Sequence, residues 1–268
     1  MRANFHTHSI YCDGNDTPAV MAAAAAKKRL TALGFSGHSY LPFDPCGMTE
    51  AQQAGYRTAV LAEKEKYGGS LRIYLGIEQD YFSGRREEGF DFAIGSVHFI
   101  RCGEEYLCVD RSAEETRYII DTYFGGDQYA YAEEYFSLVG QVLDVTGGDF
   151  VGHFDLLRKF DEEGKVFDES HPRYRSAVLN ALDKLCAAGA IFEINTGAIS
   201  RGYRKTPYPS RWILEEIRKR NGNILINSDC HHAPHLDFAY DEAVTLAKAA
   251  GFTHQMCFDG EKFVPAPF

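Results

Sequence analysis

Short apolar segments alternate with longer segments of helical periodicity along the whole chain, and this alternation constrains the fold more than any other feature. The predicted strands are residues 3–6, 32–37, 72–77, 90–97, 150–153, 191–195 and 224–228. The predicted helices are residues 17–29, 49–67, 113–122, 129–146, 171–188, 210–220 and 236–250. Strands that alternate with helices form a parallel sheet. About seven such units without a glycine-rich dinucleotide motif favour an α/β barrel over an open doubly wound sheet.

The chain reads as one domain over residues 1–268, because no linker, repeat or low-complexity tract interrupts the alternation. Its 28 Lys and Arg residues against 38 Asp and Glu residues give a formal net charge of −10. Nucleic-acid binding that is independent of sequence needs a basic face, so this charge argues against a nucleic-acid partner. No apolar run is long enough to cross a membrane or to serve as a secretion signal.

The cysteine count points to the compartment. Seven cysteines are an odd number in a chain too long to need disulfide stapling. We therefore predict reduced thiols in a cytoplasmic protein that has no membrane partner. The sequence leaves the oligomeric state open.

Residues of the metal-binding types fall where the predicted strands end. They are His6, His8, His38, Glu78, His98, His153, Asp229 and His231. The C-terminal ends of barrel strands converge on one face, which carries the chemistry in such enzymes. A lone His in such a place is more often structural than a ligand. His6-x-His8 and Asp229-x-His231, however, each place two side chains on one side of an extended segment, so the set predicts a single cluster.

This donor set predicts a metal centre of a particular kind. Imidazoles and carboxylates without a thiolate suit zinc, iron or manganese. The cluster offers more donors than one ion can use, so we expect two or three divalent ions. Glu78 is the natural bridge, because a carboxylate can offer one oxygen to each of two ions. Two ions about 3.5–4 Å apart can activate a shared hydroxide and hold a phosphoryl group.

The order and spacing of these motifs resemble those of the polymerase and histidinol phosphatase (PHP) superfamily. The matching residues are His6-Thr7-His8, His38, Glu78, Gly95-Ser96-Val97-His98, Gly152-His153 and Ser228-Asp229-Cys230-His231. Within the superfamily, residues 193–196 and 208–210 resemble the branch that hydrolyses histidinol phosphate in histidine biosynthesis. The resemblance implies a distorted (β/α)7 TIM-like barrel and a trinuclear metal site.

The resemblance also implies how the ligands divide among the ions. The three sets are His6, His8 and Asp229; Glu78, His98 and His153, with Glu78 bridging to the first ion; and His38, His231 and a residue of the first loop. Many relatives have a His in that loop, whereas this chain reads Cys12-Asp13-Gly14. We expect Asp13 to take its place, because a carboxylate can serve as the same ligand.

Three arginines fall in loops on the same predicted face. Arg158 follows the fifth strand, and Arg201 and Arg204 follow the sixth. The planar guanidinium group matches phosphate oxygens, so we predict that these residues bind phosphate. The resemblance supports Arg158 and an arginine in the region of Arg201.

The expected activity is the hydrolysis of a small phosphate monoester, with histidinol phosphate as the substrate that the resemblance implies. A hydroxide that bridges two ions would attack phosphorus in line. Catalytic roles are expected for Glu78 as the bridge, for Asp229 as the base, and for His231 as an aid to departure of the alcohol.

Three alternatives remain open from the sequence. The first is a PHP phosphoesterase that acts on a nucleotide or another small phosphate ester. The second is a degenerate barrel that binds metal without catalysis, although the complete donor set argues against it. The third is an amidohydrolase-like barrel, which would call for a bridging Lys that no predicted strand end provides.

Overall fold

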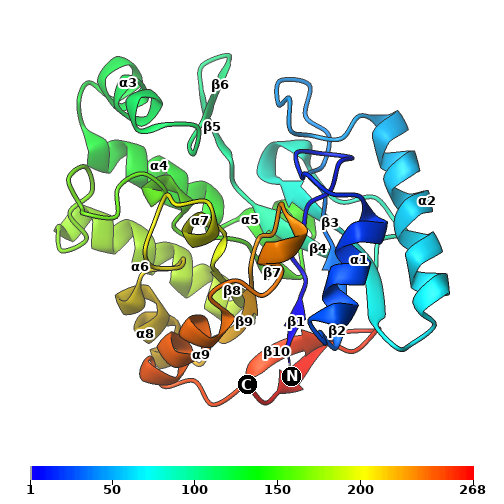
Figure 1. Cartoon of the computed structure of the whole chain (residues 1–268). Helices are drawn as coiled ribbons and strands as arrows, with labels where there is room; N and C mark the ends of the chain where they lie inside the picture. The colour runs from blue at the N-terminus through cyan, green and yellow to red at the C-terminus, as the bar shows by residue number, and fades with distance from the viewer. Residues whose placement is uncertain (1) are drawn as a thin grey trace.

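The computed structural model describes residues 2–268, and its centre is a barrel of seven parallel strands (Figure 1). The strands, in spatial order, are β1 (Ala3–Asn4), β2 (Ala32–Phe35), β3 (Arg72–Asp80), β4 (Phe92–Ser96), β7 (Phe150–Val151), β8 (Ile191–Asn195) and β9 (Asn223–Asn227). Every neighbouring pair is parallel. A parallel bridge between Thr7 and Cys230 joins the segments beyond β1 and β9, so the barrel is nearly closed. The predicted α/β barrel is confirmed.

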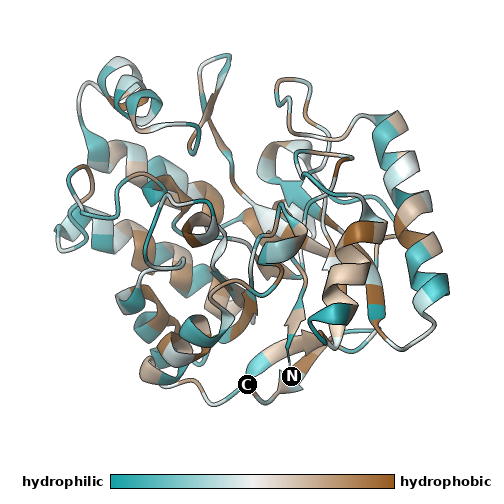
Figure 2. Ribbon diagram, in the orientation of Figure 1, coloured by the Kyte–Doolittle hydropathy of each residue, from teal (hydrophilic) through white to brown (hydrophobic). Residues whose placement is uncertain are grey.

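Helices surround the strands. They are α1 (Pro18–Lys27), α2 (Glu50–Tyr67), α3 (Ala113–Tyr123), α4 (Gln128–Val139), α5 (Val142–Thr146), α6 (Pro172–Ala187), α7 (Gly197–Ser200), α8 (Arg211–Lys219) and α9 (Tyr240–Ala249), with the 3-10 turns η1 (Tyr81–Ser83), η2 (Leu156–Arg158) and η3 (Ala233–His235). Figure 2 shows apolar and polar residues alternating along the helical turns, as expected where one face of a helix is buried. Among residues 2–268, no helix is both long and apolar enough to cross a membrane. All seven cysteines are free thiols, as predicted.

Local sequence signals explain where the helices begin. The Thr17 side chain accepts a hydrogen bond from Val20 N at the start of α1, and Pro18 occupies the first turn. Thr49 and Gln52 form a reciprocal capping box at the start of α2. These caps satisfy amide groups that would otherwise lack a partner, so each helix starts within a residue of its predicted position.

Two predicted helices differ from the structure. The helix predicted over residues 129–146 divides at Gly140 into α4 and α5. A Cβ atom on Gly140 would lie 3.2 Å from Ala181 Cα, so this glycine lets α4 approach α6 closely. The helix predicted from residue 236 begins at Tyr240 instead. The carbonyl of Leu236 accepts hydrogen bonds from Asn4 Nδ2 and Ser228 Oγ, which tie it to the barrel rather than to a helix.

Two antiparallel hairpins were not predicted. The hairpin β5–β6 (Phe99–Cys102 and Glu105–Cys108) follows β4 at the C-terminal end of the barrel. The hairpin β10–β11 (Gln255–Phe258 and Phe263–Ala266) lies beside the two termini at the opposite end (Figure 1). Phe263 packs edge-on against Phe5 and Phe150, with ring centroids 5.7 and 5.5 Å apart. The second hairpin therefore closes the N-terminal end of the barrel with an aromatic core.

A ring inside the barrel explains two strand glycines. Phe92 of β4 is fully buried, and its Cζ atom would lie 2.6 Å from a Cβ atom on Gly34 and 2.3 Å from one on Gly76. Neither position has room for a methyl group while the ring stays in place. The aromatic ring and the two glycines of β2 and β3 therefore form one packing unit.

We expect Gly76→Ala to lower the free energy of unfolding by about 1–3 kcal/mol, because the added methyl group overpacks the site of the Phe92 ring. Denaturant unfolding of the purified protein measures the loss. A smaller side chain in place of the Phe92 ring should relieve the strain. The double variant Gly76→Ala with Phe92→Leu should therefore lose less free energy of unfolding than the sum of the losses in the two single variants. Simple additivity of the two losses would contradict the assigned contact.

Candidate metal centre

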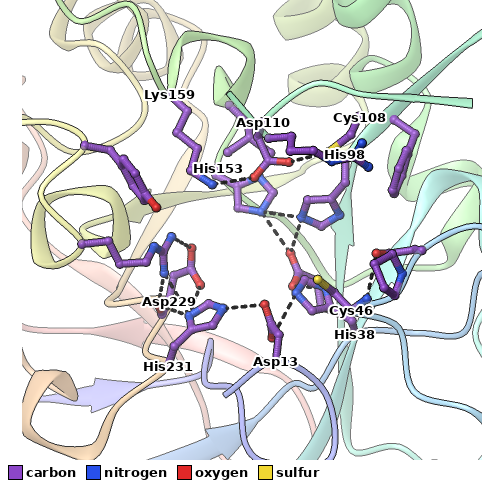
Figure 3. A pocket seen from close by; sticks show the side chains of 18 residues that line it. Asp13, His38, Cys46, His98, Cys108, Asp110, His153, Lys159, Asp229 and His231 are labelled. Atoms are coloured by element: carbon purple, nitrogen blue, oxygen red, sulfur yellow. Dashed lines mark hydrogen bonds and ion pairs between the residues drawn. The ribbon is translucent and has the colours of Figure 1, made fainter. Parts of the chain in front are cut away.

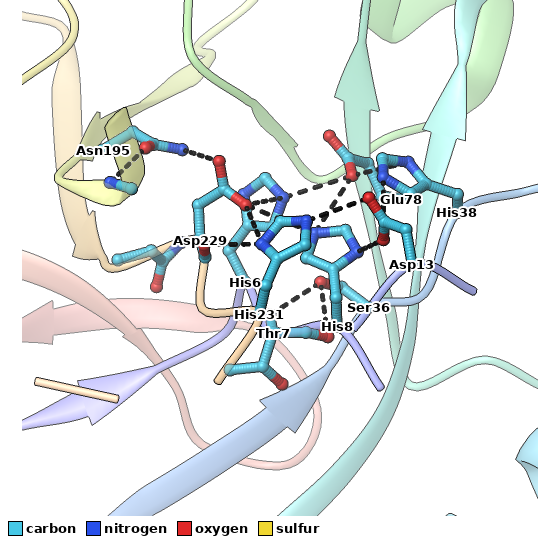
Figure 4. A network of polar contacts seen from close by, with 12 residues as sticks. His6, Thr7, His8, Asp13, Ser36, His38, Glu78, Asn195, Asp229 and His231 are labelled. Carbon is cyan, nitrogen blue, oxygen red and sulfur yellow. Dashed lines mark hydrogen bonds and ion pairs between the residues drawn. The ribbon is translucent and has the colours of Figure 1, made fainter. Parts of the chain in front are cut away.

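The donor residues expected at the strand ends lie together at the C-terminal end of the barrel (Figures 3 and 4). Thr7 fixes the direction of its neighbours His6 and His8. Its Oγ1 donates to Gly34 O at 2.8 Å, and its N–H donates to Ser36 Oγ at 3.0 Å. These bonds hold the segment beside β2 in an extended form. His6 and His8, on either side of Thr7, therefore both face the barrel interior.

Glu78 of β3 lies at the centre of the cluster. Its Oε1 is 3.0 Å from His153 Nε2 and 3.3 Å from His98 Nε2. Its Oε2 is 3.2 Å from His6 Nε2 and 3.0 Å from His38 Nδ1. The two oxygens thus face two different groups of imidazoles, which is the arrangement that a bridging carboxylate requires.

Asp229, beyond β9, completes a second group of donors. Its Oδ1 lies 3.4 Å from His8 Nε2 and 3.8 Å from His6 Nε2. The backbone of Asp229 has a positive φ of 46°, a conformation that non-glycine residues adopt rarely. Such a conformation at a residue that faces a polar cluster is typical of functional sites.

Asp13 reaches the cluster from the loop after β1 (Figure 4). Its Oδ2 is 3.1 Å from His231 Nε2, and its Oδ1 is 3.4 Å from His8 Nδ1 and 3.6 Å from His38 Nε2. The structure therefore places this carboxylate where the resemblance led us to expect a third set of ligands.

The spacing and burial of these donors suit cations. Two donors that each lie about 2.1 Å from a tetrahedral zinc ion are about 3.4 Å apart, which is close to the separations within each group. His6 Nε2, His8 Nε2 and Glu78 Oε2 are buried and make no hydrogen bond to any of residues 2–268. Buried polar atoms without partners are uncommon in native proteins, and here they face one another across the centre.

The charges around the centre keep its carboxylate side chains ionised. Burial raises the pKa of Glu78, but the neighbouring His6 and His38 outweigh it and hold that pKa well below its usual value. Burial acts in the same way on Asp229, where Arg201 and His6 keep the pKa well below its ordinary range. Both carboxylates are thus kept in the charged form that binds a cation.

Two further carboxylates, of Asp80 and Glu193, contact the Nδ1 atoms of His98 and His6. Asp80 Oδ2 accepts a hydrogen bond from His98 N at 3.0 Å and lies 3.2 Å from His98 Nδ1. Glu193 Oε1 lies 2.8 Å from His6 Nδ1. Sequence reasoning assigned no function to Glu193, although an acidic residue inside an apolar strand was a signal that could have found it.

A cavity of about 340 Å³ opens onto the donors (Figure 3). Besides the donor residues, its lining includes the cations Arg111, Lys159 and Arg201 and the acids Asp44 and Asp110. Lys159 was not expected from the sequence, and its Nζ pairs with Asp110 Oδ2 at 2.9 Å. The cavity therefore combines a donor cluster on its floor with mixed charges on its wall.

Of the three arginines predicted to bind phosphate, the structure places only Arg201 in this cavity. Its Nη1 donates to Asp229 O at 2.9 Å, and its Nη2 lies 3.0 Å from Asp229 Oδ2. Nη1 also lies 2.9 Å from His231 Nδ1. These contacts keep the guanidinium group beside the donor cluster.

Arg158 and Arg204 lie elsewhere, along a second cavity of about 700 Å³. Arg158 Nη1 pairs with Glu169 Oε1 at 2.5 Å and donates to Ser210 Oγ at 3.1 Å. Arg204 Nη1 donates to Arg158 O at 2.9 Å, and its guanidinium group lies 4.8 Å from the ring centre of Tyr208. These partners hold both side chains away from the metal cavity, which corrects the expectation that they reach a phosphate bound there.

Comparisons with known proteins agree with this architecture. A histidinol-phosphatase from Bacillus subtilis is 28% identical over 260 residues, which cover 88% of this chain and 96% of that protein. A crystal structure of histidinol phosphate phosphatase from Lactococcus lactis, complexed with zinc, L-histidinol and phosphate, matches with a TM-score of 0.73. That match covers 98% of each chain at 20% sequence identity, a level at which the likeness shows the fold.

The family is shown by a different comparison. The model of the PHP domain family matches residues 4–197, which is well over half of the chain. The matched segment begins at β1 and ends beyond β8, so it includes all the donor residues except those that follow β9. The resemblance inferred from the sequence is thus confirmed, and the chain belongs to the PHP domain family.

Proposed function

We propose that this protein is a metal-dependent phosphomonoesterase whose substrate is L-histidinol phosphate. The observation that carries the proposal is the buried cluster of imidazoles and carboxylates that opens onto a cavity at the C-terminal end of the barrel. The likeness to a histidinol-phosphatase over most of both chains supports the choice of substrate. Such an activity would place the protein in histidine biosynthesis.

Three groups of residues would hold the ions. One consists of His6, His8 and Asp229; another of Glu78, His98 and His153; the third of Asp13, His38 and His231. Zinc, iron or manganese, when bound there, supplies Lewis-acid chemistry at a phosphoryl group. Glu78 would join the first two groups, because each of its oxygens faces a different one.

The cavity wall provides the groups that would recognise the substrate. Arg201 and Lys159 both line the cavity and offer cationic donors for phosphate oxygens. The carboxylate of Asp44 suits the amine of an amino alcohol, and Phe99 and Tyr203 give apolar surface in the same cavity. A cavity of about 340 Å³ is within the usual range for small-molecule sites.

Proton transfer would fall to residues beside Arg201. Its guanidinium group and Asn195 Nδ2 hold Asp229 Oδ2, at 3.0 and 3.3 Å, and leave Oδ1 directed at the donor cluster. We assign to Asp229 Oδ1 the role of proton acceptor during attack at phosphorus. His231, which also lines the cavity, would assist departure of the alcohol.

Phosphate release from a panel of esters tests the proposal. With metal bound, kcat/KM for L-histidinol phosphate should exceed that for nucleoside monophosphates and simple aryl phosphates by at least about 10²-fold, because the cavity offers polar partners for the amino alcohol. A flat substrate profile would favour a PHP phosphoesterase that acts on nucleotides or other small esters. Metal binding without turnover of any ester would instead identify a barrel that binds metal but does not catalyse.

A further inference from the structure

Four nitrogen atoms surround the carboxylate of Glu193 in β8. Its Oε1 lies 2.8 Å from His6 Nδ1 and 2.9 Å from Asn227 Nδ2. Its Oε2 lies 2.9 Å from His153 N and 2.8 Å from Asn195 Nδ2. The residue is completely buried, and these four nitrogens are the hydrogen-bond partners of its carboxylate among residues 2–268.

Three of these nitrogens can only donate. The backbone N–H of His153 is a donor in every state. Asn195 Oδ1 accepts from Gly197 N at 2.9 Å, and Asn227 Oδ1 accepts from Phe5 N at 2.8 Å. Because each side-chain oxygen is held by a backbone N–H, the NH2 group of each asparagine must face the carboxylate.

The fourth contact then determines the tautomer of His6. Three hydrogen bonds donated to a carboxylate favour its ionised form, so the hydrogen in this contact belongs to His6 Nδ1. In the neutral form that binds a metal ion, His6 therefore carries its lone pair on Nε2. That atom is 3.2 Å from Glu78 Oε2 and makes no hydrogen bond to any of residues 2–268.

We propose that Glu193 is a positioning residue that presents His6 Nε2 to a metal ion and ties His153 to the same anchor. The inference rests on the metal-binding part of the proposed function. A hydrogen bond from the distal nitrogen of a histidine ligand to a carboxylate fixes the orientation of the ring and increases its basicity. Here one carboxylate serves a histidine from each of two donor groups, through the His6 side chain and the His153 backbone.

Glutamine cannot replace Glu193 in this role. Its amide offers one acceptor oxygen, and its NH2 group would oppose two of the four donors. We expect Glu193→Gln to weaken zinc binding by about 10–100-fold, measured by competition with a chromophoric chelator. Thr146→Val is the matched control, because Thr146 is also fully buried and hydrogen-bonded but touches none of the proposed ligands. The control should bind zinc as the unaltered protein does.

Nitrogen NMR of the histidine rings gives a second readout that requires no substitution. In the full-length, zinc-loaded protein, His6 should show a protonated Nδ1 and a zinc-bound Nε2. An unprotonated Nδ1, or zinc bound through Nδ1, would overturn the proposal even if Glu193→Gln failed to fold. Equal zinc affinity in Glu193→Gln and the unaltered protein would also overturn it. Neither measurement uses a phosphate ester, so a wrong substrate assignment would leave both results intact.

Discussion

Replacing Glu78 with alanine should abolish phosphatase activity and lower the bound metal in the same sample. Its two oxygens face different imidazole groups, at 3.0 Å from His153 Nε2 and 3.2 Å from His6 Nε2, so the loss would affect two donor groups at once. Losing about 4 kcal/mol of metal-derived transition-state stabilisation corresponds to about a 10³-fold fall in kcat. Phosphate release and elemental analysis on one preparation measure both effects.

The control for this substitution is another buried acid. Glu63 of α2 is also buried, but its carboxylate pairs with Lys66 at 2.9 Å and lies outside the donor cluster. Glu63→Gln should therefore retain both turnover and metal content. Retained turnover in Glu78→Ala would contradict the proposed mechanism, whereas loss of turnover with full metal content would limit Glu78 to a role other than ligand.

The strand-end donors could be predicted from sequence because two simple periodicities place them. Parallel strands bring their C-terminal ends to one face, and alternation along an extended segment puts residues i and i+2 on one side. His6 and His8 follow this rule, since Thr7 between them bonds to the neighbouring strand. The barrel itself follows from the same repeated pattern of strand and helix.

These periodicities do not predict where the arginine side chains of the loops point. Arg158 and Arg201 both follow barrel strands, yet Arg158 is held by Glu169 and Ser210 while Arg201 is held by Asp229. Loop position fixes where a Cα atom lies, but the direction of a long side chain depends on partners that are distant in sequence. The role of Glu193 could not be assigned from the sequence for the same reason, because it depends on four contacts that only the folded barrel creates.

Removal of metal by a chelator should eliminate phosphatase activity and lower the melting temperature by about 5–10 °C for each ion removed. An ion present at about 100 times its Kd contributes about 2.7 kcal/mol to stability, and in a chain of this size about 1 kcal/mol shifts the melting temperature by roughly 2–4 °C. The metal-free barrel should still fold, because the acids and imidazoles of the empty cluster pair with one another, as Glu78 does with His38 at 3.0 Å. Activity assays and thermal unfolding, before and after dialysis, measure both effects.

Adding back single metals shows which ion the centre uses. Zinc, manganese or iron should restore turnover, because six of the nine proposed ligands are imidazoles, whereas calcium prefers oxygen ligands and should fail. Full activity in a preparation stripped of metal would exclude the proposed mechanism. The number of equivalents needed distinguishes two ions from three. Asp13→Ala should remove only the third, because Asp13 contacts both histidines of that group, His38 and His231. Asp13 meets His8 at Nδ1 rather than at Nε2, the nitrogen that lies near Asp229.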